Sequence, residues 1–162
     1  MKKTAAGFTL VEMIVVIAVI GVLAAILVPT MMGYTKKAKH AAANANAKSL
    51  LNAGMLACRE AEVVKPIPAG FYSKDGGLDF DSNAIANATM NEYIGQHFAM
   101  IDNCIWAVNV QSDVVVAACV SDTVDSPYVG TYPHPNQESA DSLRKLGSFG
   151  PALKFGQTGS WT

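Results

Sequence analysis

The chain has 162 residues, of which 51% are apolar and 15% are charged, and its formal net charge is −1. This composition is too apolar and too weakly charged for an intrinsically disordered chain, and the length allows one ordinary domain plus an appendage. The near-neutral charge gives no overall argument for a nucleic acid as partner.

The amino-terminal segment has a short basic stretch, Met1–Gly7, and then an apolar block from Phe8 to Val28 that precedes Pro29. A helix over this block would rise about 30 Å at about 1.5 Å per residue, which matches the hydrocarbon core of a bilayer. The block is apolar on all sides, as is typical of a membrane helix. An ordinary secretory signal peptide and a plain single-pass anchor are the alternatives, but the block is long for a signal peptide and an anchor does not explain Glu12.

Glu12 is the one charged residue in the apolar block. A carboxylate is costly in the hydrocarbon layer, although the cost falls near a helix end. One interpretation is that the side chain reaches the lipid headgroups. The other is that a cation enters the apolar layer with it.

The hexad Gly7-Phe8-Thr9-Leu10-Val11-Glu12, followed by the apolar block and Pro29, resembles the processing site of type IV prepilins and pseudopilins, with a short leader of the type IVa kind (a class III signal). The resemblance implies that a prepilin peptidase cuts between Gly7 and Phe8, and that Phe8 becomes an N-methylated amino terminus. It also implies that Glu12 pairs during assembly with the terminal amine of Phe8 on a neighbouring subunit. Such a pair would make burial of the carboxylate conditional on correct register.

Two residues weaken the helix within this segment. Gly21 lowers helix propensity, and Pro29 removes a backbone donor and can kink the helix. By analogy with the family, the stretch between Gly21 and Pro29 is expected to loosen in a filament.

Beyond Pro29 the chain stays helix-prone, and apolar residues recur at spacings of three and four over residues 38–62. Pro66 and Pro68 then forbid continuation. The pattern predicts one helix of about 55 residues, from Phe8 to near Val63.

The remaining chain predicts a helix over residues 84–99, a hairpin of strands at 104–110 and 114–120, a third strand at 128–132 and a short helix at 139–146. A small sheet needs a packed helix for stability, which the long helix can supply. The predicted fold class is α+β and pilin-like: a long amino-terminal helix whose apolar half protrudes and whose amphipathic half packs on an antiparallel sheet. The expected parts are a leader at 1–7, a membrane or filament-core helix at 8–33 and a globular head at 34–162.

The cysteines, Cys58, Cys104 and Cys119, form no C-x-x-C pair, which argues against a zinc ribbon or a thioredoxin-like site. Cys104 and Cys119 fall on the two strands of the predicted hairpin. They are a candidate disulfide if the register allows it, and reduced buried thiols are the alternative.

Asp79, Asp81 and Asn83 place oxygen ligands at alternate positions, like the start of an EF-hand loop, and are a weak calcium candidate. Ala84 stands where such a loop needs Gly, and Met90 where it needs Glu. A polar turn in which Asn83 caps the next helix is the alternative.

No catalytic constellation is apparent. His40, His97 and His134 share no metal-ligand spacing and are expected at the surface or in turns. There is no G-x-S-x-G elbow, P-loop or Rossmann fingerprint. We therefore expect no enzyme, no cofactor and no resident metal. The basic residues from Lys36 to His40 are expected to form a solvated or headgroup-facing collar, with a nucleic-acid patch on an assembled fibre as the alternative.

The resemblance implies a structural subunit of a type IV pilus, with adhesion, motility or DNA uptake as its tasks. One alternative is a pseudopilin of a type II secretion or competence machine, and another is a surface binding module on a pilin-like anchor. The implied partners are further copies of the chain, the prepilin peptidase and N-methyltransferase, an assembly platform and the membrane, while a nucleic acid or carbohydrate ligand stays open. The implied location is the cytoplasmic membrane as a single-pass precursor, then a pilus outside the cell.

Overall fold

The computed structural model describes residues 7–64, 66–74, 84–137, 142–146 and 148–161. The chain divides into two compact units, Met1–Lys37 and Ala38–Thr162. The Asp79, Asp81 and Asn83 calcium candidate lies outside the described residues.

The long helix is confirmed. Helix α1 runs from Leu10 to Val64 over 55 residues and contains Pro29 without ending there. Near this proline, the Thr30 hydroxyl donates a hydrogen bond of 2.8 Å to the Leu27 carbonyl oxygen. The helix ends two residues before Pro66, as the proline pair predicts.

The described part of α1 in the first unit is exposed along its whole length. Its large apolar side chains are exposed, from 47% for Met13 to 80% for the preceding Phe8, and the series continues to Tyr34. Within the described residues, α1 is the helix long and apolar enough to cross a membrane. These side chains therefore need lipid or protein from outside the chain to bury them.

The second unit contains an antiparallel four-stranded sheet in the order β1-β2-β3-β4. The strands are β1 (Gly70–Lys74), β2 (Ile105–Gln111), β3 (Val114–Ser121) and β4 (Gly130–Tyr132). The other helices are α2 (Ala84–His97), α3 (Leu143–Leu146) and α4 (Gly150–Thr158). The α+β class and the β2–β3 hairpin are confirmed, whereas β1 and α4 were not predicted.

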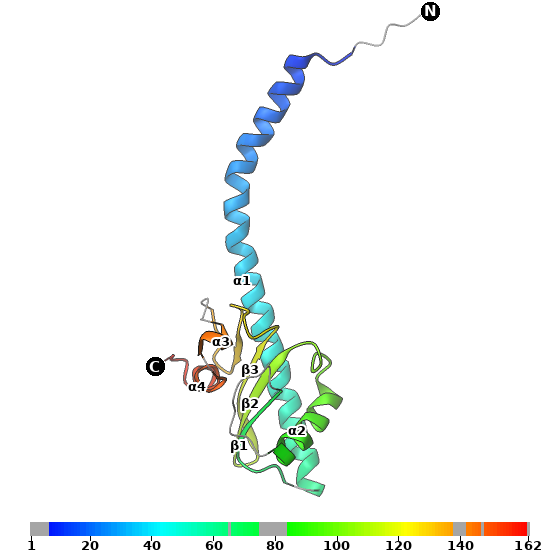
Figure 1. The fold of residues 1–162 in the computed structure, drawn as a ribbon, viewed down its shortest axis with the longest axis vertical. Coiled ribbons are helices and arrows are strands. Elements are labelled where there is room, and N and C mark those ends of the chain that lie inside the picture. Colours follow the sequence, from blue (N-terminus) through cyan, green and yellow to red (C-terminus); the bar gives the residue numbers. More distant parts are fainter. Residues whose placement is uncertain (1–6, 65, 75–83, 138–141, 147, 162) are drawn as a thin grey trace, which may run out of the picture. The chain divides into compact units, whose positions relative to one another are not determined.

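Helices α1 and α4 lie on opposite faces of the sheet (Figure 1), and each face has its own hydrophobic core. On one face, Leu50 and Ala57 of α1 share a core with Trp106 and Val108 of β2. Met90 and Ile94 of α2 complete that core. The amphipathic half of α1 therefore packs on this face of the sheet, as its sequence pattern predicts.

The opposite face of the sheet is covered by α4. Ala107 and Cys119 on the strands form a separate core with Phe149, Ala152 and Leu153. The carboxy-terminal residues therefore close the second side of the sheet, so that the head has three layers: helix, sheet and helix.

The candidate Cys104–Cys119 disulfide is not formed in the structure, which has the alternative of buried thiols, because the hairpin register separates the two side chains. The turn is formed by Ser112 and Asp113, both at positive φ, and Gln111 pairs with Val114. A register shift beyond Val110 then places Cys119 opposite Ala107. Cys104 belongs to the core against α1 and Cys119 to the core on the other face, and both are buried thiols without a disulfide.

Candidate functional site

The amino-terminal turn of α1 holds Glu12 in a reciprocal pair with Thr9. The Thr9 backbone N–H and hydroxyl donate hydrogen bonds of 2.8 and 2.6 Å to Glu12 Oε2. In return, the Glu12 backbone N–H donates to Thr9 Oγ1 at 3.3 Å. This is a capping box, in which Thr9 precedes the helix and Glu12 is its third residue.

The capping box satisfies the Glu12 carboxylate within one chain. It also satisfies two backbone donors that would otherwise be open at the start of α1. The spacing Thr-x-x-Glu signals such a box in the sequence, but Thr9 was not predicted as the partner of Glu12.

The Gly7–Phe8 peptide bond lies just before this turn. Both residues are exposed, and a Cβ built on Gly7 would have no atom within 4 Å. Nothing in the fold itself requires glycine at position 7, so a requirement for it would have to come from an outside agent.

Gly21 lies inside the continuous α1 helix, as does Pro29. A Cβ on Gly21 would also meet no atom within 4 Å. The single chain therefore keeps its helix between these residues, and the loosening expected in a filament stays a prediction.

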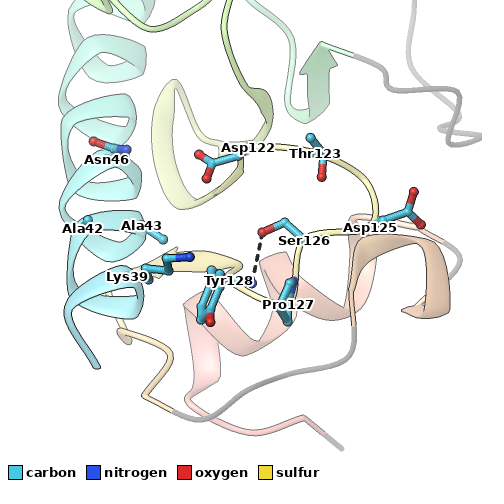
Figure 2. Close-up of a pocket in the computed structure, with 10 residues that line it drawn as sticks. All are labelled: Lys39, Ala42, Ala43, Asn46, Asp122, Thr123, Asp125, Ser126, Pro127 and Tyr128. Carbon is cyan, nitrogen blue, oxygen red and sulfur yellow. Dashed lines mark hydrogen bonds between the residues drawn. The ribbon is translucent and has the colours of Figure 1, made fainter. Parts of the chain in front are cut away.

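The second unit has an open pocket of about 460 Å³ between α1 and the loop that follows β3 (Figure 2). The residues that line it are Lys39, Ala42, Ala43, Asn46, Asp122, Thr123, Asp125, Ser126, Pro127 and Tyr128. Sequence reasoning did not find this pocket, because the loop and the helix are about eighty residues apart in sequence and only the fold joins them.

Tyr128 links this loop to α1. The Lys39 ammonium lies 5.1 Å from the centre of the Tyr128 ring, and the His40 ring packs edge-on against it at 5.1 Å between centroids. His40 is only 6% exposed, and its Nδ1 has no hydrogen-bond partner among the described residues. Burial lowers the pKa of His40. The expectation that His40 lies at the surface is therefore wrong.

Asn44 of α1 fastens the following strand and loop to the helix. Its Oδ1 accepts hydrogen bonds from the backbone N–H groups of Thr131, at 3.0 Å, and Asn136, at 3.1 Å. Its Nδ2 donates to the Asn136 carbonyl oxygen at 2.7 Å. Three hydrogen bonds from one side chain therefore tie β4 and the segment after it to α1.

The part of the chain that the structure describes contains no group of three or more His, Cys, Asp or Glu side chains that could hold a metal ion. The described amino-terminal part of the chain is an exposed apolar helix, and its one acid, Glu12, is hydrogen-bonded within the same chain. Such a surface can bind lipid or another protein.

Comparison with known proteins agrees with this description. Residues 2–28 match the family described as the prokaryotic N-terminal methylation motif. The chain is 36% identical over 73 residues to the type IV narrow pilus major component PilA5 of Thermus thermophilus. That match covers 45% of this chain and 63% of the relative, so the chain spans less than two thirds of the relative's length. No solved structure matches.

Proposed function

We propose that the chain, whose amino-terminal segment makes it a type IV prepilin-like protein, is a structural subunit that polymerises into a cell-surface filament. The observation that carries the proposal is the exposed apolar half of α1, which has one acid, Glu12, near its start. A membrane can cover this helix in the precursor, and other copies can cover it in a polymer. The similarity to a pilus major component favours a pilus over a secretion pseudopilus.

Processing would act on the exposed Gly7–Phe8 bond. A prepilin peptidase would cut there, and the new amino terminus at Phe8 would be N-methylated. Cleavage places a cationic amine one residue before Thr9, at the turn where Glu12 already lies.

Glu12 would then exchange partners during assembly. In the single chain its carboxylate accepts hydrogen bonds from Thr9, which lowers the free-energy cost of holding it in the membrane before assembly. In the polymer, we assign it to the Phe8 amine of a neighbouring copy. A buried carboxylate without a cation is strongly unfavourable, so only the correct register between copies would be stable.

Gly7→Ser tests the processing step. We expect the variant to keep its leader, because a peptidase that recognises glycine would not accept the added side chain. The matched control is Gly33→Ser, a glycine of α1 that also has no atom within 4 Å of its Cβ position. Mass spectrometry of the mature chain gives the readout. An amino terminus at Phe8 in Gly7→Ser would contradict the assignment.

Electron microscopy of sheared cells tests the filament itself. Abundant fibres that contain this chain support the pilus subunit. Absence of fibres, together with a secretion or transformation defect on deletion, supports a pseudopilin instead. Adhesion, motility and DNA uptake are tasks that such a filament can serve, and the deletion phenotype separates them.

A further inference from the structure

The charges along α1 are of one sign over most of its length. Between Glu12 and Glu60 the helix has no acidic residue, while it carries four lysines and one arginine. These basic residues are Lys36, Lys37, Lys39, Lys48 and Arg59. No carboxylate of the helix therefore lies three or four residues from any of the four lysines, whereas Glu62 follows Arg59 at a spacing of three.

The ammonium groups of Lys39 and Lys48 contact aromatic rings in the second unit. The Lys39 ammonium lies over Tyr128, and the Lys48 ammonium lies 5.9 Å from the centre of the Tyr132 ring. Lys36 and Lys37 are exposed. Ion pairs in the described part of the chain join Lys74 to Asp102 and His97 to Glu60, and neither involves Lys36 or Lys37.

The lining of the pocket beside Tyr128 carries two carboxylates, Asp122 and Asp125, against one ammonium group, that of Lys39, so negative charge is in excess there. Asp122 is exposed at the pocket and belongs to neither of these ion pairs. Figure 2 shows Lys39 extending from α1 toward Tyr128, while Asp122 comes from the loop after β3. The Asn46 amide and the hydroxyls of Thr123 and Ser126 add oxygen acceptors to the lining. The pocket therefore suits an ammonium group from outside the chain.

We propose that this pocket receives the Lys36–Lys37 segment of a second copy of the chain and is a polar contact of the filament. The proposal deepens the proposed function and rests on it. The exposed apolar surface of α1 ends at Tyr34, two residues before Lys36. Copies that cover this surface bring the following turn of helix, with its two lysines, into the same interface. A carboxylate that pairs with Lys36 or Lys37 must then come from a different copy or a different element.

The contact adds specificity to an otherwise apolar interface. Apolar side chains slide past one another at little cost, whereas a lysine opposite Asp122 is satisfied at one axial offset only. Each pair contributes little by itself, but the contact repeats at every subunit of the polymer. Fibre yield should therefore fall with increasing salt, because screening weakens exposed charge pairs.

Charge exchange tests the contact in the full-length protein. We expect Asp122→Lys, and separately the double variant Lys36→Asp/Lys37→Asp, to lower fibre yield by about threefold or more. A chain that carries all three changes should recover at least half of the wild-type yield. Glu92→Lys, at an exposed position on α2, makes the same change in net charge as Asp122→Lys and should leave the yield near wild type.

Cross-linking between copies gives a second readout. Cells that express one copy with Lys37→Cys and another with Asp122→Cys should yield a disulfide-linked heterodimer on oxidation of the fibres. The pair Lys37→Cys and Glu92→Cys is the matched control and should not. The natural cysteines are buried, so they do not compete for the new thiols.

The outcomes separate the two proposals. Wild-type fibres without charge rescue and without the cross-link would overturn this contact and leave the filament intact. A defect in Lys36→Asp/Lys37→Asp that Asp122→Lys does not rescue would assign the lysines to anionic headgroups and would likewise overturn it. Absence of wild-type fibres would overturn the proposed function and this contact together.

Discussion

At the scale of single residues, we assign Glu12 two roles, helix capping and charge pairing, and a substitution can remove one without the other. Its carboxylate caps the start of α1 through Thr9, and its charge is the feature that we assign to pairing between copies. Glutamine also serves at the third position of a capping box, but it carries no charge.

Glu12→Gln and Glu12→Leu together distinguish capping from charge. We expect both variants to remain in the membrane and to lower fibre yield by about tenfold or more, because loss of about 1.4 kcal/mol at each contact already gives tenfold. Quantitative blotting of sheared fibres and of the membrane fraction measures both quantities. Normal fibre yield in Glu12→Gln would show that capping suffices and would remove the charge pair from the mechanism.

His40 is the buried titratable side chain whose protonation should affect the head. Burial, at a position where the ring packs edge-on against Tyr128, lowers the pKa of His40 below the ordinary value of 6.5. The unfolded chain then binds a proton more readily than the folded chain, so stability is full above pH 6.5 and falls as the pH drops toward the folded pKa.

A pH series of chemical denaturation in detergent tests this link. We expect wild type to lose stability as the pH falls from about 7 to 5, by no more than about 1.4 kcal/mol per pH unit for one proton. His40→Phe should reduce that slope, because it removes the group whose proton uptake differs between the folded and the unfolded chain. Equal slopes in wild type and variant would show that His40 is not the group responsible.

At the scale of elements, β4 approaches α1 closely at Gly130. A Cβ added there would overlap the backbone carbonyl of Ala43. Helix backbone cannot move aside as a flexible side chain can, and Asn44 next to it is fixed by its bonds to Thr131 and Asn136.

Gly130→Ala should therefore destabilise the head by about 3 kcal/mol or more. The control is Gly70→Ala on β1, where an added Cβ meets no atom within 4 Å and the change should stay within about 0.5 kcal/mol. Urea denaturation followed by circular dichroism measures both. A Gly130→Ala variant as stable as Gly70→Ala would show that β4 does not lie against α1 in this way.

Elements whose cause is local were predictable from the sequence. Helix α1 and the β2–β3 hairpin follow from apolar periodicity and from β-branched runs. Strand β1 was missed because its five residues gain stability only by pairing with β2, which lies thirty residues further along the chain. Helix α4 was missed because Gly150 and Gly156 lower its propensity, although Ala152, Leu153 and Gly156 lie on one face against the sheet.

The candidate sites divide in the same way. The processing hexad and Glu12 are local in sequence, so they could be proposed without a structure. Whether Cys104 and Cys119 can pair could not be decided from the sequence. The register shift within the hairpin decides which face Cys119 occupies, and a run of valines does not reveal that shift. The Asp122 pocket depends on a contact between distant segments, which no local pattern contains.

At the scale of the whole molecule, the chain consists of a unit that cannot bury its own apolar surface and a unit that can. Residues up to Lys37 expose an apolar helix, whereas Ala38–Thr162 holds both hydrophobic cores. Stability of the head and assembly of the filament should therefore depend on different parts of one helix.

A chain that begins at Ala38 tests this division. We expect it to fold cooperatively, to stay monomeric in solution and to form no fibres, because it keeps Asn44 and the α1 residues of the core but lacks the exposed apolar surface. Size-exclusion chromatography and thermal unfolding give the readouts. A chain that begins at Leu51 is the control: it lacks Asn44, Ala47 and Leu50, so one face of the sheet is left open and it should not fold. If the Ala38 chain were unfolded too, the head would need the first unit for its stability, and the boundary between assembly and folding would lie elsewhere on α1.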